Sequence, residues 1–179
     1  MGSAGPAYIW TMRGVFAAIT VFILLAQLLP LETTPRRWVA PDLLLAFTLA
    51  WTLRRPDIVP VALVAAVFLL ADFLLQRPPG LYTALVVVAS EVARARHDDV
   101  RETVFAAEWF TATALITAVF LLYLIVTGIV SPIPVATGLL LMQALLTILV
   151  YPLVVGLSQA IFGIKIAAQG EVDDRGRRL

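Results

Sequence analysis

The chain lacks cysteine altogether and contains a single histidine, His97. The absence of cysteine excludes disulfide bonds, thiolate metal sites and cysteine nucleophiles. One histidine cannot form a histidine metal cluster, and no phosphate-binding loop, metal-ligand spacing or nucleophile motif occurs elsewhere in the sequence. We therefore expect neither enzymatic activity nor a bound cofactor or metal ion.

Charge is also scarce. Charged residues make up 14% of the 179 residues and apolar residues 61%, whereas a soluble domain has about 25% charged and about 45–50% apolar residues. The net charge of +1 gives no indication of a nucleic-acid partner. Because about 20 mostly apolar residues suffice for one transmembrane helix, the composition predicts an all-α integral membrane protein without a separate soluble domain.

Proline, glycine and charged residues divide the apolar sequence into six segments. The predicted transmembrane helices cover residues 9–29, 39–53, 58–75, 81–93, 104–130 and 135–162. The fourth segment is short and contains Glu91, so five helices plus a re-entrant segment at 81–93 are an alternative. We predict one membrane domain, residues 1–166, followed by a polar cytoplasmic tail, residues 167–179.

The distribution of basic residues predicts the orientation. With six helices, 10 of the 13 basic residues lie on the side of both termini, and 3 (Arg36, Arg37 and Arg77) lie on the opposite, outer side. Basic residues accumulate on the cytoplasmic side of membrane proteins, so both termini are predicted to be cytoplasmic. With five helices the count is again 10 against 3, but the N-terminus then lies outside.

Two aspartates are the main candidates for a functional site. Asp42 lies 14 residues before the turn at Pro56 and Asp72 lies 16 residues after it, which places both about 21–24 Å from that turn. They can form a proton or substrate site, or contact a partner helix. In the structural interpretation, Asp42 caps a helix and Asp72 pairs with an arginine or with the start of the next helix. The same outer layer contains the basic residues Arg36, Arg37 and Arg77.

Other polar and aromatic residues suggest structural roles. Glu91 and Arg94 have the i, i+3 spacing of a surface ion pair, and Glu108 lies beyond the basic connector that follows Arg94. Five aromatic residues near the ends of the predicted helices are expected to form an interfacial belt. They are Trp10, Trp38, Trp51, Tyr82 and Trp109.

The last predicted helix carries small residues at helical spacing. They are Gly156, Ala160 and Gly163, of which Gly156 and Ala160 form a small-xxx-small pattern that allows two helices to approach closely. This face can pack against a partner subunit or a second copy of the chain, giving a possible homodimer, or within the same bundle. Pro152 is expected to kink this helix.

Four short motifs together resemble the family of the rod shape-determining protein MreD. They are Pro41-Asp42-Leu43-Leu44-Leu45, Trp51-Thr52-Leu53-Arg54-Arg55-Pro56, Asp72-Phe73-Leu74-Leu75 and Pro79-Gly80-Leu81. Their order and spacing are similar to the family pattern over residues 38–85. The sequence departs from that pattern at Ala71, where the family commonly has glycine, and in its long extension before the first helix.

The resemblance implies a non-enzymatic scaffold of the bacterial cell-elongation complex in the inner membrane. A member of this family binds MreC directly and works with MreB, the glycosyltransferase RodA and a class B penicillin-binding protein. Arg54 and Arg55 are then expected at the cytoplasmic face. The family is also similar to the six-helix substrate-binding subunits of energy-coupling-factor transporters. A small-molecule-binding or transporter subunit, with a cavity lined by Gln143, Gln159 or Thr147, is therefore the alternative function.

Overall fold

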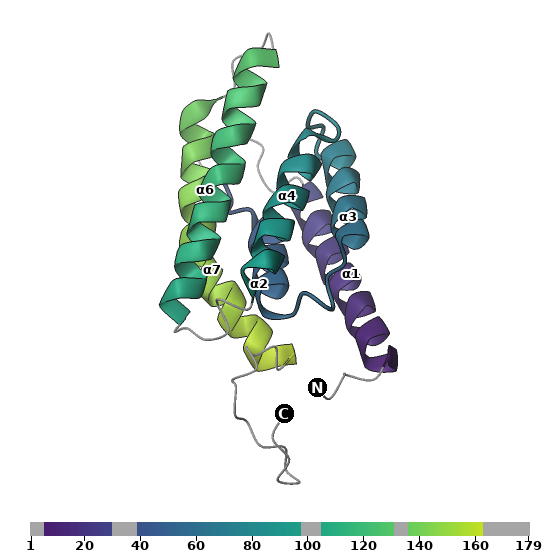
Figure 1. Ribbon diagram of the computed structural model, residues 1–179. Helices are drawn as coiled ribbons and strands as arrows, with labels where there is room; N and C mark the ends of the chain where they lie inside the picture. Colours follow the sequence, from purple (N-terminus) through teal and green to yellow (C-terminus); the bar gives the residue numbers. More distant parts are fainter. Residues whose placement is uncertain (1–5, 30–38, 98–104, 131–135, 163–179) are drawn as a thin grey trace.

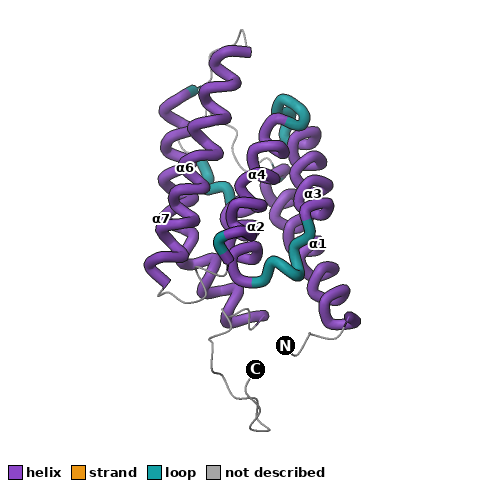
Figure 2. The backbone as a smooth tube through the Cα atoms, viewed as in Figure 1, coloured by secondary structure: helices purple, strands orange, loops and turns teal. Residues whose placement is uncertain are grey.

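The computed structural model describes residues 6–29, 39–97, 105–130 and 136–162, and within these ranges it contains helices and no strand (Figures 1 and 2). Each of the six predicted segments contains a helix. The helices are α1 (Pro6–Leu28), α2 (Leu43–Arg54), α3 (Val61–Leu74), α4 (Leu81–Ala95), α6 (Phe105–Val130) and α7 (Thr137–Phe162). Several predicted features lie outside the described residues: Arg36, Arg37, Trp38, Gly163 and the tail at 167–179.

The helices fall into two length classes. Those of the first class, α1, α6 and α7, are long and apolar enough to cross a membrane, which indicates a membrane protein. Shorter helices make up the second class: α2, α3 and α4 have 12, 14 and 15 residues, or about 18, 21 and 22 Å at 1.5 Å per residue.

The short helix α2 occupies the centre of the bundle. It contacts α1, α4, α6 and α7, and every residue from Leu44 to Arg54 is buried. A helix that is mostly apolar on all sides lies in the interior of a protein or in a membrane, and other helices enclose α2. It begins at Leu43 rather than at the predicted residue 39, because Asp42 is its N-cap.

An aromatic cluster packs α1 and α7 against α2. The Trp51 ring lies 5.0–5.6 Å from the rings of Phe16, Phe47 and Phe162, within the range of favourable aromatic contacts. Trp51 and Tyr82 are buried, so their predicted place in an interfacial belt is wrong. Both lie close to helix ends in the sequence, but these ends are inside the bundle.

Helix α7 continues through Pro152, and its C-terminal part turns toward the N-terminal end of α1 (Figure 1). Proline has no N–H, so the carbonyl group four residues earlier, at Ile148, loses its partner within the helix. The indole Nε1 of Trp109 on α6 donates to this oxygen at 3.2 Å. Trp109 therefore fixes the interrupted turn of α7 against α6.

Candidate functional site: two buried polar clusters

Asp42 joins the start of α2 to two other helices. Its Oδ1 accepts a hydrogen bond from the backbone N–H of Leu45 at 3.0 Å, and its Oδ2 accepts one from the Tyr82 hydroxyl of α4 at 2.7 Å. Its own N–H donates to Oγ1 of Thr147 on α7 at 2.8 Å. The predicted role of Asp42 as a helix cap is confirmed.

Asp72 holds the start of α4. Its buried Oδ2 accepts from the backbone N–H groups of Gly80 and Thr83, at 3.0 and 3.2 Å, and from the Thr83 hydroxyl at 2.8 Å. Gly80, the N-cap of α4, has a φ of +85°, a conformation that glycine adopts without steric cost. Of the alternatives for Asp72, pairing with the start of the next helix is the one observed.

Arg77 lies beside both carboxylates, in the loop between α3 and α4. Its guanidinium nitrogen is 3.9 Å from Oδ2 of Asp42, and the group lies over the Tyr82 ring at 4.5 Å. Burial acts to lower the pKa of Arg77, but the acidic groups around it, Asp42 first and then Tyr82, Tyr123 and Asp72, together outweigh burial and raise the pKa above its ordinary value. The structure thus brings together Asp42, Asp72 and Arg77 of the predicted outer layer.

We call this arrangement the Asp42 cluster, and its charges nearly cancel. Each carboxylate lies at a helix N-terminus, α2 for Asp42 and α4 for Asp72, and a helix N-terminus carries about half a positive charge. Together with Arg77 these charges offset the two carboxylates. The Asp42 cluster consists of Asp42, Asp72, Arg77, Tyr82, Thr83 and Thr147.

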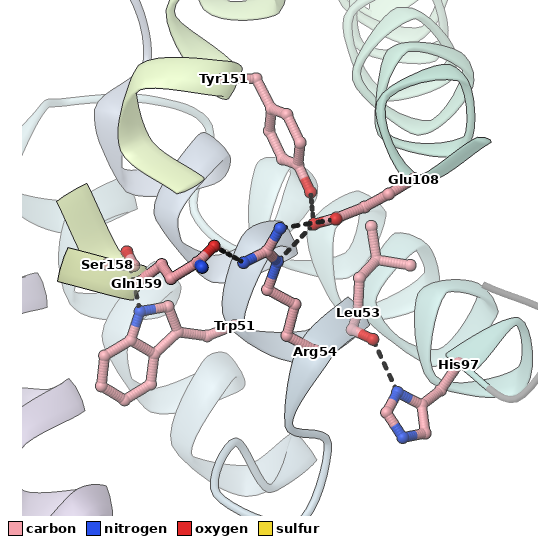
Figure 3. A network of polar contacts seen from close by, with 8 residues as sticks. All are labelled: Trp51, Leu53, Arg54, His97, Glu108, Tyr151, Ser158 and Gln159. Carbon is pink, nitrogen blue, oxygen red and sulfur yellow. Dashed lines mark hydrogen bonds and ion pairs between the residues drawn. The ribbon is translucent and has the colours of Figure 1, made fainter. Parts of the chain in front are cut away.

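A second group of polar side chains, the Arg54 cluster, lies at the other end of α2 (Figure 3). Two nitrogens of Arg54 donate to the two carboxylate oxygens of Glu108 on α6, both at 2.8 Å. Oε1 of the same carboxylate accepts from the Tyr151 hydroxyl at 3.1 Å, and Arg54 also donates to Gln159 at 3.3 Å. The cluster, defined as Arg54, Glu108, Tyr151 and Gln159, therefore ties α2 to α6 and α7.

Arg54, which the sequence places at the cytoplasmic end of α2, is buried between helices. Its side chain is 6% exposed and that of Glu108 is 0% exposed. This pair was not predicted, because the two residues are 54 positions apart and belong to helices that meet only in the folded bundle. An acidic residue inside an apolar segment was the one available signal, since such a residue requires a partner.

The turn between α2 and α3 is held by basic side chains of α4. Arg94 donates to the carbonyl oxygens of Pro56 and Val59 at 2.8 and 2.7 Å. His97 Nδ1 donates to the carbonyl oxygen of Leu53 at 2.6 Å. The carbonyl groups at the end of α2 and in the turn after it lack helical hydrogen-bond partners, and these side chains supply the missing donors.

Two ion pairs lie nearer the surface at this end. Arg94 pairs with Glu91 at 3.0 Å, which confirms the predicted i, i+3 contact. Arg55 pairs with Asp57 at 2.8 Å. The hydrogen bond to Asp57 raises the pKa of Arg55. Burial acts to raise the pKa of Asp57, but the hydrogen bond and charge of Arg55, with smaller contributions from the Asp57 backbone and from His97, together leave that pKa below its ordinary value.

The small residues of α7 lie on the outside of the bundle. Gly156 and Ala160 are exposed, and a Cβ atom added to Gly156 would meet nothing within 4 Å. The interpretation that this pair packs against another helix of the same bundle is therefore wrong. These residues present a narrow strip of backbone to whatever surrounds the helix.

Two of the three side chains predicted to line a small-molecule cavity make bonds inside the protein. Thr147 accepts from the Asp42 N–H, and Gln159 accepts from Arg54. Across the residues that the structure describes, no three histidine or acidic side chains come together as possible metal ligands. The carboxylates of Asp42, Asp72 and Glu108 thus connect helices, and both clusters anchor α2.

No family model, curated protein or solved structure matches the chain.

Proposed function

We propose that the chain is a non-enzymatic scaffold of the bacterial cell-elongation complex, similar to the MreD family, and that it binds MreC. One observation carries the proposal: Asp42, Arg54 and Asp72, three of the four charged residues of the motifs that resemble this family, engage in buried bonds that fix α2 or α4. A scaffold must present a fixed surface to its partners, and charged groups used as internal anchors provide such rigidity.

The proposed partner surface is the outward face of α7. Gly156 and Ala160 allow another transmembrane helix to approach closely, and van der Waals packing at small residues is the main source of helix association in lipid. Through the same complex the scaffold works with MreB, RodA and a class B penicillin-binding protein. A second copy of the chain is another possible occupant of this face.

We further propose that all six helices cross the bacterial inner membrane with both termini in the cytoplasm. Helix α4 supports six crossings, because its Tyr82 contacts Asp42 at one end of α2 and its Arg94 contacts the α2–α3 turn at the other. The bundle then has the number of helices found in the substrate-binding subunits of energy-coupling-factor transporters. The positive-inside rule supports the orientation.

Co-purification tests the scaffold function. The full chain and MreC are expressed together, extracted in mild detergent, and purified through a tag on the chain. We expect MreC to be retained, and the double variant Gly156→Leu, Ala160→Leu to retain roughly tenfold less, because bulky side chains keep the partner helix at a distance.

Gly14→Leu is the matched control, since Gly14 is an exposed helical glycine of α1 with nothing within 4 Å of an added Cβ. This variant should retain MreC like the unmodified chain. A complete absence of MreC from the unmodified chain would contradict the scaffold proposal. Equal retention by all variants would exclude the α7 face as the site of contact.

A further inference from the structure

Arg77 has unused hydrogen-bonding capacity at the edge of the bundle. Within the described part of the chain its guanidinium group makes the 3.9 Å approach to Asp42 and the stacking contact with Tyr82, and no hydrogen bond. Its side chain is 22% exposed. The guanidinium carbon lies over the Tyr82 ring, 4.5 Å from its centre, and the N–H groups of a guanidinium can bind both oxygens of a phosphate or carboxylate.

The hairpin that carries Arg77 is short for a membrane. Helices α3 and α4 have 14 and 15 residues, or about 21 and 22 Å, whereas the hydrocarbon core of a bilayer is about 30 Å thick. If the turn beside Arg55 and Asp57 lies at one membrane surface, Arg77 at the other end of α3 does not reach the opposite surface. A short hydrophobic segment is accommodated by local thinning of the bilayer or by side chains that extend to the headgroups.

Helix α6 extends further toward this side of the membrane than the α3–α4 hairpin does. The Tyr82 ring beneath Arg77 contacts Tyr123 of α6 at 5.5 Å, and α6 continues from there to Val130, about 10 Å further. Figure 1 shows α6 rising beyond the α3–α4 hairpin. The exposed side chains of this extension include Ile125, Ile129 and Val130, which are suited to acyl chains. Arg77 therefore lies at a depth where lipid tails surround the neighbouring helix.

We propose that Arg77 binds the phosphate group of a phospholipid, which is drawn down over the short α3–α4 hairpin. The acyl chains of this lipid lie against the end of α3, where Phe73 is 62% exposed and Leu74 is also exposed. Asp42 and Tyr82 act as positioning residues, because they hold the guanidinium group in place. The proposal rests on the six-helix membrane placement proposed above and does not depend on MreC binding.

Native mass spectrometry of the purified full chain tests the site. The protein is stripped of lipid in detergent, incubated with phosphatidylglycerol, and compared with the variants Arg77→Gln and Arg96→Gln. Arg96 is an exposed arginine at the opposite end of α4 and serves as the control for unspecific attraction to charge. We expect one retained phospholipid per chain, roughly tenfold lower occupancy in Arg77→Gln, and no change in Arg96→Gln.

A second measurement uses the unmodified chain alone, so it does not depend on the folding of any variant. Phosphatidylglycerol is compared with diacylglycerol of the same acyl chains, which has no phosphate, and free inorganic phosphate is added as a competitor. Preferential retention of phosphatidylglycerol that resists free phosphate supports a lipid site. Equal retention of both lipids, displacement by free phosphate, or equal loss in Arg77→Gln and Arg96→Gln would overturn the proposal. MreC binding is measured in a separate experiment, so a failure of the lipid site can be told apart from a failure of the scaffold proposal.

Discussion

At the scale of single residues, the buried charges act as connectors between helices. Arg54 and Glu108 form a bidentate ion pair that is closed off from solvent and shared with Tyr151 and Gln159. Such a pair contributes little net stability compared with well-packed apolar residues, but loss of one partner leaves a buried charge without compensation. Its main effect is to fix the positions of α6 and α7 relative to α2.

Substitution of one partner should therefore lower the free energy of unfolding more than substitution of both partners. We expect Glu108→Leu to lower the free energy of unfolding by about 3–5 kcal/mol, and the double variant Arg54→Met, Glu108→Leu to be more stable than Glu108→Leu alone. Thermal unfolding in one detergent measures the difference. Glu91→Gln, which breaks the exposed pair with Arg94, is the control and should cost less than about 1 kcal/mol. A double variant less stable than Glu108→Leu would contradict this explanation.

At the scale of elements, α7 depends on a side chain of α6 at the turn interrupted by Pro152. The Trp109 indole N–H occupies the Ile148 carbonyl oxygen that Pro152 leaves without a partner. This contact explains how a helix of 26 residues keeps a proline in its interior. It also gives Trp109 a structural role that the predicted interfacial belt does not include.

A double-mutant cycle between Trp109 and Pro152 tests this role. Trp109→Phe removes the N–H and should lower the free energy of unfolding by about 1 kcal/mol. In the Pro152→Ala background the alanine supplies its own N–H to Ile148, so Trp109→Phe should cost clearly less. Chemical or thermal unfolding of the four proteins measures the coupling. An equal cost in both backgrounds would show that the indole hydrogen bond is not specific to the interrupted turn.

At the scale of the whole molecule, the course of α4 distinguishes the proposed six-helix arrangement from the five-helix alternative. Helix α4 runs from the Asp42 cluster to the α2–α3 turn, where Arg94 binds two carbonyl groups. In the six-helix arrangement, the α3–α4 loop therefore lies outside and the end of α4 lies in the cytoplasm. In the five-helix alternative, both of these positions lie in the cytoplasm.

The absence of native cysteine makes this arrangement directly measurable. Single cysteines are introduced as Pro79→Cys in the α3–α4 loop and as Ala95→Cys at the end of α4, both at exposed positions. Intact spheroplasts are then treated with a membrane-impermeant maleimide. We expect labelling of the first variant, and labelling of the second only after lysis. No labelling of either before lysis would favour five helices, and labelling of Ala95→Cys alone would reverse the orientation.

The sequence by itself determined the helical class and the approximate helix positions, because apolar segments interrupted by proline, glycine and charge have few other stable forms in lipid. It also included the Asp42 helix cap among its alternatives and indicated the pairing of Glu91 with Arg94, since these contacts join residues close together in the chain. Local chemistry is sufficient for such contacts.

Only the tertiary structure decided which helix lies at the centre and which long-range partners the buried charges have. Trp51 and Arg54 lie near a helix end in the sequence, a position typical of a membrane surface, yet both are buried because α2 is surrounded by its neighbours. The pairing of Arg54 with Glu108, and of Asp42 with Tyr82, requires helices distant in sequence to meet at the same height. Hydrophobic periodicity does not specify that height; packing and the need to compensate buried charge specify it.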